Sequence, residues 1–213
     1  MKEYVLTQAA PQIQYLTAAD PRLGALIKKI GDISYTLSSD PFSFLVNTIV
    51  GQMLSKKVSN AICARLTEKC GGAISTGAIS CLDVDDLRFI GLSNSKAKYI
   101  LNLTEAAVLR KIDFGKLPEL DDAEVIDVLT SVRGIGFWSA KMYLIFTLGR
   151  EDVLPYEDGA FLQSYEWMYG VKGEGAKDIQ KRCAVWKPYS TAAARYLYRA
   201  LDDGLTKNPF SGV

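Results

Sequence analysis

Two features between residues 129 and 158, in LTSVRGIGFWSAKMYLIFTLGREDVLPYED, could do chemistry: a glycine turn and a carboxylate. Gly134 and Gly136 flank Ile135, and glycines at such positions adopt φ > 0 and let the backbone approach another molecule closely. We expect Ile135 to fill the core while the N–H groups that open the next helix point outward, where the helix dipole favours an anion such as a DNA phosphate. An ordinary corner between two helices, without a ligand, is the alternative.

The carboxylate closes a Pro-x-x-Asp step from Pro155 to Asp158, which ends 20 residues after Trp138. A helix of ~11 residues advances ~16 Å. The nine residues from Gly149 to Glu157 can then span up to ~30 Å. The chain can therefore leave the glycine turn and return a carboxylate to the same cleft. Asp158 can also cap the helix that follows it, and the two roles are compatible.

The composition excludes several mechanisms. The sequence contains no histidine, which removes Ser-His-Asp triads, Cys-His nucleophiles, His-ligated zinc and imidazole acid–base catalysis. The four cysteines form no CxxC pair, so we expect four free, buried thiols in a reducing compartment rather than a metal site. Any chemistry must use carboxylates, hydroxyls, lysine, tyrosine or backbone dipoles.

Charge is nearly balanced over the whole chain, at +1, but it is unevenly distributed. Residues 133–150 contain three basic side chains and no acidic one, and residues 88–111, which include Ser93 and Lys96, contain five basic side chains and one acidic one. The acidic residues gather in 83–86 and 119–127. A phosphate-binding face requires such a separation, although a solvated face with unrelated charge runs would produce the same pattern.

These residues must be positioned by helices, because apolar residues recur at helical spacing through most of the chain. We expect an all-α fold of about ten helices, with one strand-like segment near Tyr4 and Ile13. Pro21 opens the first expected helix and Gly31 ends it. The other expected helices lie at 42–51, 55–69, 83–91, 95–109, 122–131, 137–148, 158–169, 177–186 and 190–201.

Length and hydropathy set the broad class of protein. A chain of 213 residues suffices for one domain or for two small lobes that share a core. The longest charge-free stretch, 41–55, has 15 residues and includes Asn47 and Gln52, so it is too short and too polar to cross a bilayer. The N-terminus lacks the continuous apolar core of a signal peptide. We therefore expect an intracellular protein of the cytoplasm, nucleoid or nucleus.

The stretches LTSVRGIGFWSAKM and DVLPYED resemble the helix-hairpin-helix (HhH-GPD) DNA glycosylase superfamily, which removes damaged bases from DNA, and especially its 3-methyladenine DNA glycosylase II branch. DPFSFLVNTIVGQMLSKK, LRFIGLSNSKAKYI and WKPYSTAAARYLY agree in order and spacing, so the likeness runs from Asp20 to Leu201. The resemblance implies two helical lobes with an active cleft between them. One lobe would span 38–152, with the hairpin at about 122–147, and the other would combine 1–37 with 153–213.

The resemblance also implies a catalytic residue. In that family the aspartate three residues after the proline is catalytic, which selects Asp158 over its neighbour Glu157. Such a carboxylate stabilises an oxocarbenium-like sugar and orients or deprotonates a water. Relatives that also cut the DNA backbone carry a Schiff-base lysine at the second position after the last hairpin glycine, where this chain has Trp138. The cysteines that hold an iron–sulfur cluster in those relatives are missing too, so we expect a monofunctional glycosylase without that cofactor.

Further site residues follow from the same resemblance. The pocket for the flipped base would be formed by Trp138, Tyr198 and Met142. The residues expected at the DNA backbone are Gly134, Ile135, Gly136, Lys141, Ser93 and Lys96. Met53 would fill the gap that the flipped base leaves in the duplex, with Gln52 as the second candidate. Some relatives hold Na⁺ or K⁺ on hairpin carbonyls, which here would be those of Thr130, Val132 and Ile135.

The expected activity is therefore a step of base excision repair. The enzyme would flip alkylated purines of the 3-methyladenine type out of duplex DNA and hydrolyse their N-glycosidic bond, acting as a monomer without a membrane partner. Two alternatives stay open at this point. The same fold could act on uracil, hypoxanthine or an oxidised purine, or the chain could be a non-catalytic protein that only binds DNA through its hairpin.

Overall fold

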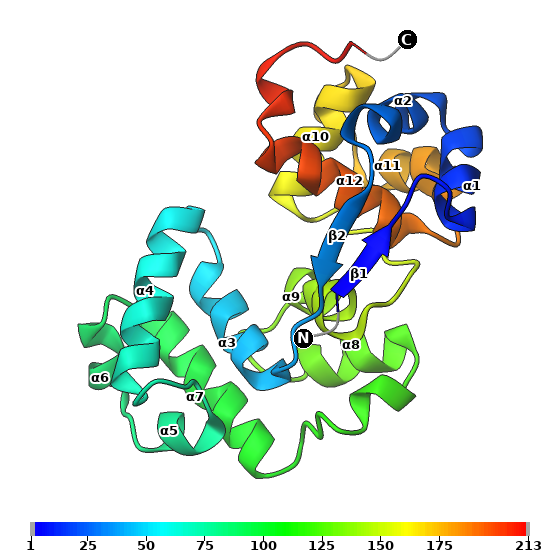
Figure 1. Cartoon of the computed structure of the whole chain (residues 1–213). Coiled ribbons are helices and arrows are strands. Elements are labelled where there is room, and N and C mark those ends of the chain that lie inside the picture. Colours follow the sequence, from blue (N-terminus) through cyan, green and yellow to red (C-terminus); the bar gives the residue numbers. More distant parts are fainter. Residues whose placement is uncertain (1–2, 212–213) are drawn as a thin grey trace. The chain divides into compact units, whose positions relative to one another are not determined.

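The computed structural model describes residues 3–211 (Figure 1). The chain divides into two compact units: a middle unit, Ser38–Leu148, and a terminal unit in which the residues up to Leu37 join those from Gly149 onward. Both units are built from helices, and the described residues contain one small two-stranded sheet. The prediction of an all-α fold is confirmed. No helix of the described part reaches the length and apolar character that crossing a membrane needs.

The middle unit begins with an Asp-Pro step at Asp40, where the proline fixes the first helical φ and the Asp40 carboxylate accepts the N–H of Ser43 at 3.0 Å. Its core is formed by apolar residues of several helices that are less than 1% exposed, among them Leu45, Ile100 and Leu129. Its helices are α3 (Pro41–Gly51), α4 (Lys56–Lys69), α5 (Thr76–Ser80), α6 (Val84–Phe89), α7 (Asn94–Val108), η1 (Leu117–Glu119), α8 (Asp122–Thr130), α9 (Phe137–Tyr143) and the π-helical turns of η2 (Leu144–Leu148).

The terminal unit is organised around its last long helix. Ala193, Ala194 and Ala200 of this helix are fully buried, and such small side chains let neighbouring helices pack closely against it. The elements of this unit are β1 (Glu3–Leu6), α1 (Pro11–Ala19), α2 (Pro21–Ile30), β2 (Ile33–Thr36), α10 (Gly159–Tyr169), α11 (Ala176–Cys183), η3 (Ala184–Trp186), α12 (Ser190–Asp202) and η4 (Leu205–Lys207).

A buried carboxylate joins three elements of the terminal unit. Asp20 is 6% exposed and caps α2 by accepting the N–H groups of Arg22 at 3.0 Å and Leu23 at 3.1 Å. Its other oxygen accepts the indole N–H of Trp186 at 2.8 Å and the hydroxyl of Tyr169. These four hydrogen bonds compensate the carboxylate of Asp20 for the water that it loses in the core.

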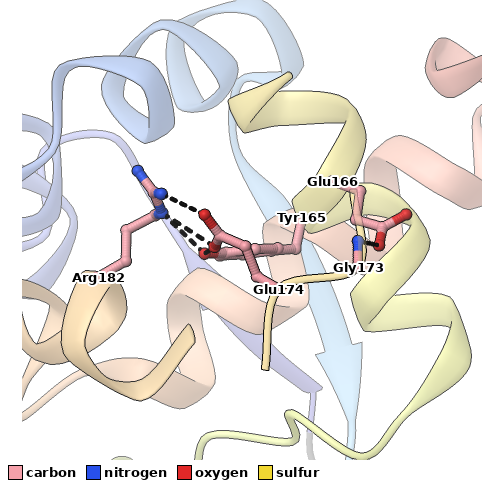
Figure 2. A network of polar contacts seen from close by, with 5 residues as sticks. All are labelled: Tyr165, Glu166, Gly173, Glu174 and Arg182. Carbon is pink, nitrogen blue, oxygen red and sulfur yellow. Dashed lines mark hydrogen bonds and ion pairs between the residues drawn. The ribbon is translucent and has the colours of Figure 1, made fainter. Parts of the chain in front are cut away.

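A second polar cluster fastens the connection between α10 and α11 (Figure 2). Glu174 accepts the hydroxyl of Tyr165 and the guanidinium of Arg182, each at 2.5 Å, and Arg182 also donates to the Tyr165 oxygen at 2.8 Å. Glu166 accepts the N–H of Gly173 at 2.8 Å. These contacts close the loop that follows α10, the helix whose first turn carries Asp158.

Several sequence-based expectations are corrected at the N-terminus. The strand near Tyr4 is present as β1, but it pairs antiparallel with β2, which the sequence analysis did not predict. The expected alternation at Ile13 is wrong, because Ile13 lies in α1 with Pro11 at its first position.

Helices α1 and α5 were not predicted, since each spans fewer than three turns and shows little helical periodicity.

The second boundary of the middle unit lies after Leu148 and not at residue 152. The reason is that the intervening residues bond to the start of α12: the carbonyl of Glu151 accepts the N–H of Thr191 at 3.0 Å, and Asp152 accepts the hydroxyl of Ser190 at 2.5 Å. The cysteines differ from expectation as well. Cys183 is buried, but Cys81 is exposed and the other two are half-buried, so the thiols are not uniformly buried.

Candidate functional site

The glycine turn between α8 and α9 is a tight hairpin. Gly134 has φ = 112°, a conformation that favours glycine, whereas Gly136 is extended, with φ = −102° and ψ = 178°. The expectation of positive φ at both glycines is therefore wrong for Gly136. Ile135 is 4% exposed, and its N–H donates to the carbonyl of Val132 at 3.0 Å. The hairpin thus turns its apolar residue into the core, as expected from the sequence.

Gly134 lies directly on an aromatic ring from another helix. A Cβ atom added at Gly134 would be 2.3 Å from Cγ of Tyr99, which belongs to α7. No other side chain can occupy this position without displacing the ring. At Gly136, by contrast, an added Cβ would meet no atom within 4 Å. The start of α9 is therefore sterically open, and Gly136 offers no side chain to cap its first N–H groups.

The other predicted hairpin and pocket residues lie along α9. Trp138 and Lys141 are half-buried, and Met142 is 6% exposed. Phe137, the first residue of α9, is 62% exposed and was not singled out from the sequence. An exposed aromatic beside a glycine turn is a signal that could have identified it. The roles of these residues toward DNA or a base stay predictions.

Lys96 is half-buried, and the phosphate contact predicted for it stays a prediction. Its ammonium donates to two backbone carbonyls, those of Val50 at 2.8 Å and Gln52 at 2.6 Å. Burial lowers the pKa of Lys96 below its ordinary value. Counting charges along the sequence could not distinguish an inward-facing lysine from a solvated one. Ser93 is exposed and its hydroxyl caps α7 by accepting the N–H of Lys96 at 3.3 Å.

The segment Gly51–Ser55, named the wedge loop below, is a tight turn between α3 and α4. The carbonyl of Gly51 accepts the N–H of Leu54 at 3.1 Å, Gln52 has φ = −51° and ψ = 127°, and Met53 has φ = 57°. These values define a type II β-turn. Met53 is 102% exposed, so its whole side chain projects into solvent.

Gln52 is the other candidate for filling a gap in the duplex, and its side chain is already engaged. The amide nitrogen donates to the carbonyl of Gly134 at 3.0 Å and lies 3.4 Å from the hydroxyl of Ser139. The geometry therefore favours Met53 as the inserting side chain. The hydrogen bond between Gln52 and Gly134 also connects the wedge loop to the hairpin, and the sequence alone did not indicate this connection.

The chemistry of the hairpin carbonyls is compatible with the predicted monovalent cation, which stays a prediction. The carbonyls of Thr130, Val132 and Ile135 are neutral donors without a carboxylate, a set suited to Na⁺ or K⁺ rather than to a divalent ion. The Val132 oxygen accepts one N–H and keeps a second lone pair. In the part of the chain that the structure describes, no group of acidic or cysteine side chains is arranged to bind a metal.

Asp158 lies in the terminal unit as the N-cap of α10. Its carboxylate accepts the N–H of Phe161 at 2.8 Å, and the side chain is 9% exposed. The carbonyl of Pro155 accepts the N–H of Asp158 at 2.9 Å, which closes the Pro-x-x-Asp turn. The proline, the turn and the helix end thus fix the direction of this carboxylate. Glu157, the rival, is exposed.

Tyr198 of α12 is buried close to Asp158, and the carboxylate acts on its pKa. Burial, followed by the charge of Asp158 and hydrogen bonding to it, raises the pKa of Tyr198 well above its ordinary value. The hydroxyl therefore stays protonated at neutral pH. The sequence analysis expected the ring of Tyr198 to stack on a base. It did not expect the hydroxyl of Tyr198 to lie beside Asp158.

A buried cation lies close to this pair. Arg195, one turn before Tyr198 on α12, is 7% exposed and its guanidinium lies 3.6 Å above the ring of Tyr35. Burial lowers the pKa of Arg195, and its charge in turn lowers that of Tyr198, against the larger effects that raise it. The sequence analysis missed Arg195. The signal was an arginine within the alanine-rich, otherwise buried run STAAARYLY.

There is open space at the residue that follows Asp158. Gly159, the first residue of α10, is exposed, and a Cβ added there would meet no atom within 4 Å. The structure therefore brings together Asp158, Tyr198 and Arg195 in the terminal unit, and it brings the wedge loop and the hairpin together in the middle unit. The cleft expected between the two lobes, and the placement of Trp138 and Met142 beside Asp158, stay predictions.

Known proteins share this fold and this arrangement of motifs. Residues 46–188 match the family described as HhH-GPD superfamily base excision DNA repair protein. Because this match covers most of the chain, the protein belongs to the HhH-GPD superfamily.

Individual relatives extend the likeness over nearly the full length. DNA-3-methyladenine glycosylase 1 of Schizosaccharomyces pombe is 28% identical over 205 residues, which are 93% of this chain and 90% of that protein. The crystal structure of a DNA-3-methyladenine glycosidase from Bacillus halodurans is 30% identical with a TM-score of 0.83, covering 100% of this chain and 98% of that one. The S. pombe 3-methyladenine DNA glycosylase in complex with abasic DNA is 26% identical with a TM-score of 0.83, covering 91% and 97%.

Proposed function

We propose that this protein is a monofunctional DNA glycosylase of base excision repair that removes alkylated purines, of the 3-methyladenine type, from duplex DNA. The observation that carries the proposal is the Asp158 carboxylate, held at the N-terminus of α10 with open space at Gly159. The family and the names of the relatives support the same activity. The relative solved with abasic DNA supports DNA as the partner.

Asp158 acts on the sugar. As the bond between C1′ and the base nitrogen breaks, positive charge develops on the deoxyribose ring, and a nearby carboxylate stabilises that charge. The same carboxylate orients a water, or takes its proton, as the water oxygen bonds to C1′. The products are the free base and an abasic sugar. The proton lost by the water is held by Asp158 or passed to solvent.

The leaving group needs no acid. An alkylated purine carries a positive charge on its ring, so the electron pair of the breaking bond neutralises it and the base departs uncharged. This explains how a chain without histidine can perform the reaction. Tyr198 keeps its proton, and we assign it the task of donating to Asp158 and holding the carboxylate in the orientation that faces the sugar.

The absence of a lysine nucleophile makes the enzyme monofunctional. Trp138 occupies the second position after Gly136, where a Schiff-base lysine would have to stand. Lys141 follows on the next turn of α9 and is half-buried. Base pocket residues would be Trp138 and Met142, with the small Gly159 and Ala160 leaving room for bulkier lesions. The hairpin, with a monovalent cation on Thr130, Val132 and Ile135, would hold one DNA phosphate.

The test is base release from duplexes that carry a single defined lesion, comparing the wild type with Asp158→Asn. Asparagine caps helices as well as aspartate does, so the variant keeps the bond to the N–H of Phe161 while losing the charge. We expect release of alkylated purines to fall by at least about a hundredfold, with an unchanged unfolding midpoint and unchanged binding to abasic DNA.

Three results would contradict the proposal. If the wild type binds DNA but releases no base, the chain is a binding protein. If Asp158→Asn stays active, another group does the chemistry. If borohydride traps a covalent adduct between the enzyme and DNA, the enzyme uses an amine nucleophile and is not monofunctional.

A further inference from the structure

The apex of the wedge loop is held in a conformation that its residue disfavours. Met53 has φ = 57° at the third position of the type II turn, where glycine or asparagine is ordinarily found. A side chain with a Cβ atom avoids this region. Such strain persists only where surrounding contacts impose it, and it gathers at functional sites.

The exposure of Met53 is also unfavourable. An apolar groove of about 400 Å³ borders the same loop, and Met53 lies on its rim with Leu54, Val58 and Ile62. A flexible methionine would gain free energy by turning further into this groove and leaving water. It is instead 102% exposed. The exposed side chain and the positive φ together point to contacts that hold the turn.

Two side chains impose the turn from opposite directions. The Lys96 ammonium, from α7, bonds to the carbonyls of Val50 and Gln52, on either side of Gly51. The Gln52 amide bonds to the carbonyl of Gly134 in the hairpin. Gln52 therefore makes both contacts: its backbone carbonyl accepts from Lys96, and its side-chain amide donates to the hairpin. The turn is fixed to α7 and to the hairpin at once.

We propose that Lys96 and Gln52 are positioning residues that hold Met53 outward in a fixed register with the hairpin. Hairpin binding to a DNA phosphate and insertion of Met53 between bases are then movements of one rigid body. This inference rests on the proposed function, because insertion serves base flipping. It assigns Lys96 a positioning task that the sequence analysis did not expect.

The experiment compares a correctly paired lesion with the same lesion in single-stranded DNA, under single-turnover conditions. Flipping is costly only in the paired substrate. We expect Lys96→Met to slow release from the duplex by at least about tenfold, because the variant loses both hydrogen bonds that the charged ammonium donates. Release from the single strand should change by less than about twofold. Gln52→Leu and Met53→Ala should show the same pattern.

The matched control is Lys116→Met, which removes an exposed lysine of the same unit that lies outside both basic stretches. It should behave as the wild type on both substrates. A general structural defect would slow the two substrates equally, so equal slowing in Lys96→Met and Gln52→Leu overturns the inference. So does wild-type behaviour of both variants on the duplex.

A second readout does not depend on catalysis. A duplex with 2-aminopurine beside a stable abasic analogue becomes more fluorescent when a side chain enters and unstacks the probe. We expect saturating wild-type protein to raise this fluorescence, and Lys96→Met, Gln52→Leu and Met53→Ala to raise it less. If the wild type raises the signal and the variants raise it less, but no base is released, the proposed function fails while the positioning role of Lys96 and Gln52 is supported. If the wild type and Lys96→Met raise the signal equally, the positioning role is refuted.

Discussion

One methyl group at residue 134 should destabilise the middle unit severely, whereas the same methyl at residue 136 should be tolerated. In Gly134→Ala the new Cβ would lie 2.3 Å from Cγ and 2.4 Å from Cβ of Tyr99, distances at which the ring or the hairpin must move. Such overpacking costs about 1–3 kcal/mol. The backbone at φ = 112° adds about 1–2 kcal/mol for a residue with a Cβ atom. We therefore expect the free energy of unfolding to fall by about 2–5 kcal/mol.

Gly136→Ala is the matched control. Residue 136 has φ = −102° and open space around the added atom. The remaining penalty is the poorer capping by alanine, about 1 kcal/mol or less. The assay is urea unfolding followed by circular dichroism, with the midpoint compared at equal slope.

A double variant isolates the cause. Tyr99→Ala removes the ring atoms Cγ and Cδ1 that lie 2.3 and 2.8 Å from the added methyl, but it leaves Cβ at 2.4 Å. In this background Gly134→Ala should cost less than in the wild type, without becoming neutral. The reasoning is refuted if Gly134→Ala and Gly136→Ala unfold at the same urea concentration, or if removal of the ring leaves the cost unchanged.

Three further outcomes follow from the terminal unit. Asp158→Ala should lose about 0.5–2 kcal/mol of stability through the missing cap of α10, whereas Asp158→Asn should match the wild type in thermal unfolding. Tyr198→Phe should slow base release by about tenfold through the lost hydrogen bond to the carboxylate, with binding to abasic DNA unchanged in a titration. Hydrogen bonds from Arg182 and then Tyr165 hold the pKa of Glu174 below its usual range, so its contribution to stability is present at neutral pH and lost as the pH falls through that lowered pKa. Glu174→Gln should therefore lower the unfolding temperature at pH 7, and the difference from the wild type should shrink in acid.

The local parts of the site could be predicted from the sequence. Gly134-Ile135-Gly136 indicates a turn, and Asp158 before an amphipathic run indicates a helix cap, because both signals act over a few residues. The reason that residue 134 must be glycine could not be predicted. It depends on Tyr99, which approaches from α7 and is distant in the sequence.

The sequence analysis could not reveal features that depend on a residue's tertiary environment. Lys96 counts as one positive charge in a basic stretch, but its ammonium bonds to two carbonyls of α3 and the wedge loop. Strand β2 contains residues that favour strands, but four residues are too few to predict one, and β2 is stabilised by its pairing with β1. Arg195 gives no periodic signal of burial, since a cation inside a helical core is stable only where partners such as Tyr35 surround it.

Under the proposed mechanism, the N-cap of α10 connects folding to catalysis. A catalytic carboxylate needs a fixed direction, and enzymes with histidine can obtain it from a paired imidazole. Here the backbone of α10 supplies it, because the N–H of Phe161 holds one oxygen of Asp158 and the Pro155 turn sets the approach of the chain. The requirement for stability and the requirement for chemistry therefore fall on the same side chain but on different properties: its oxygen for the cap, its charge for the sugar. Since asparagine supplies the first property and lacks the second, a single substitution can separate them.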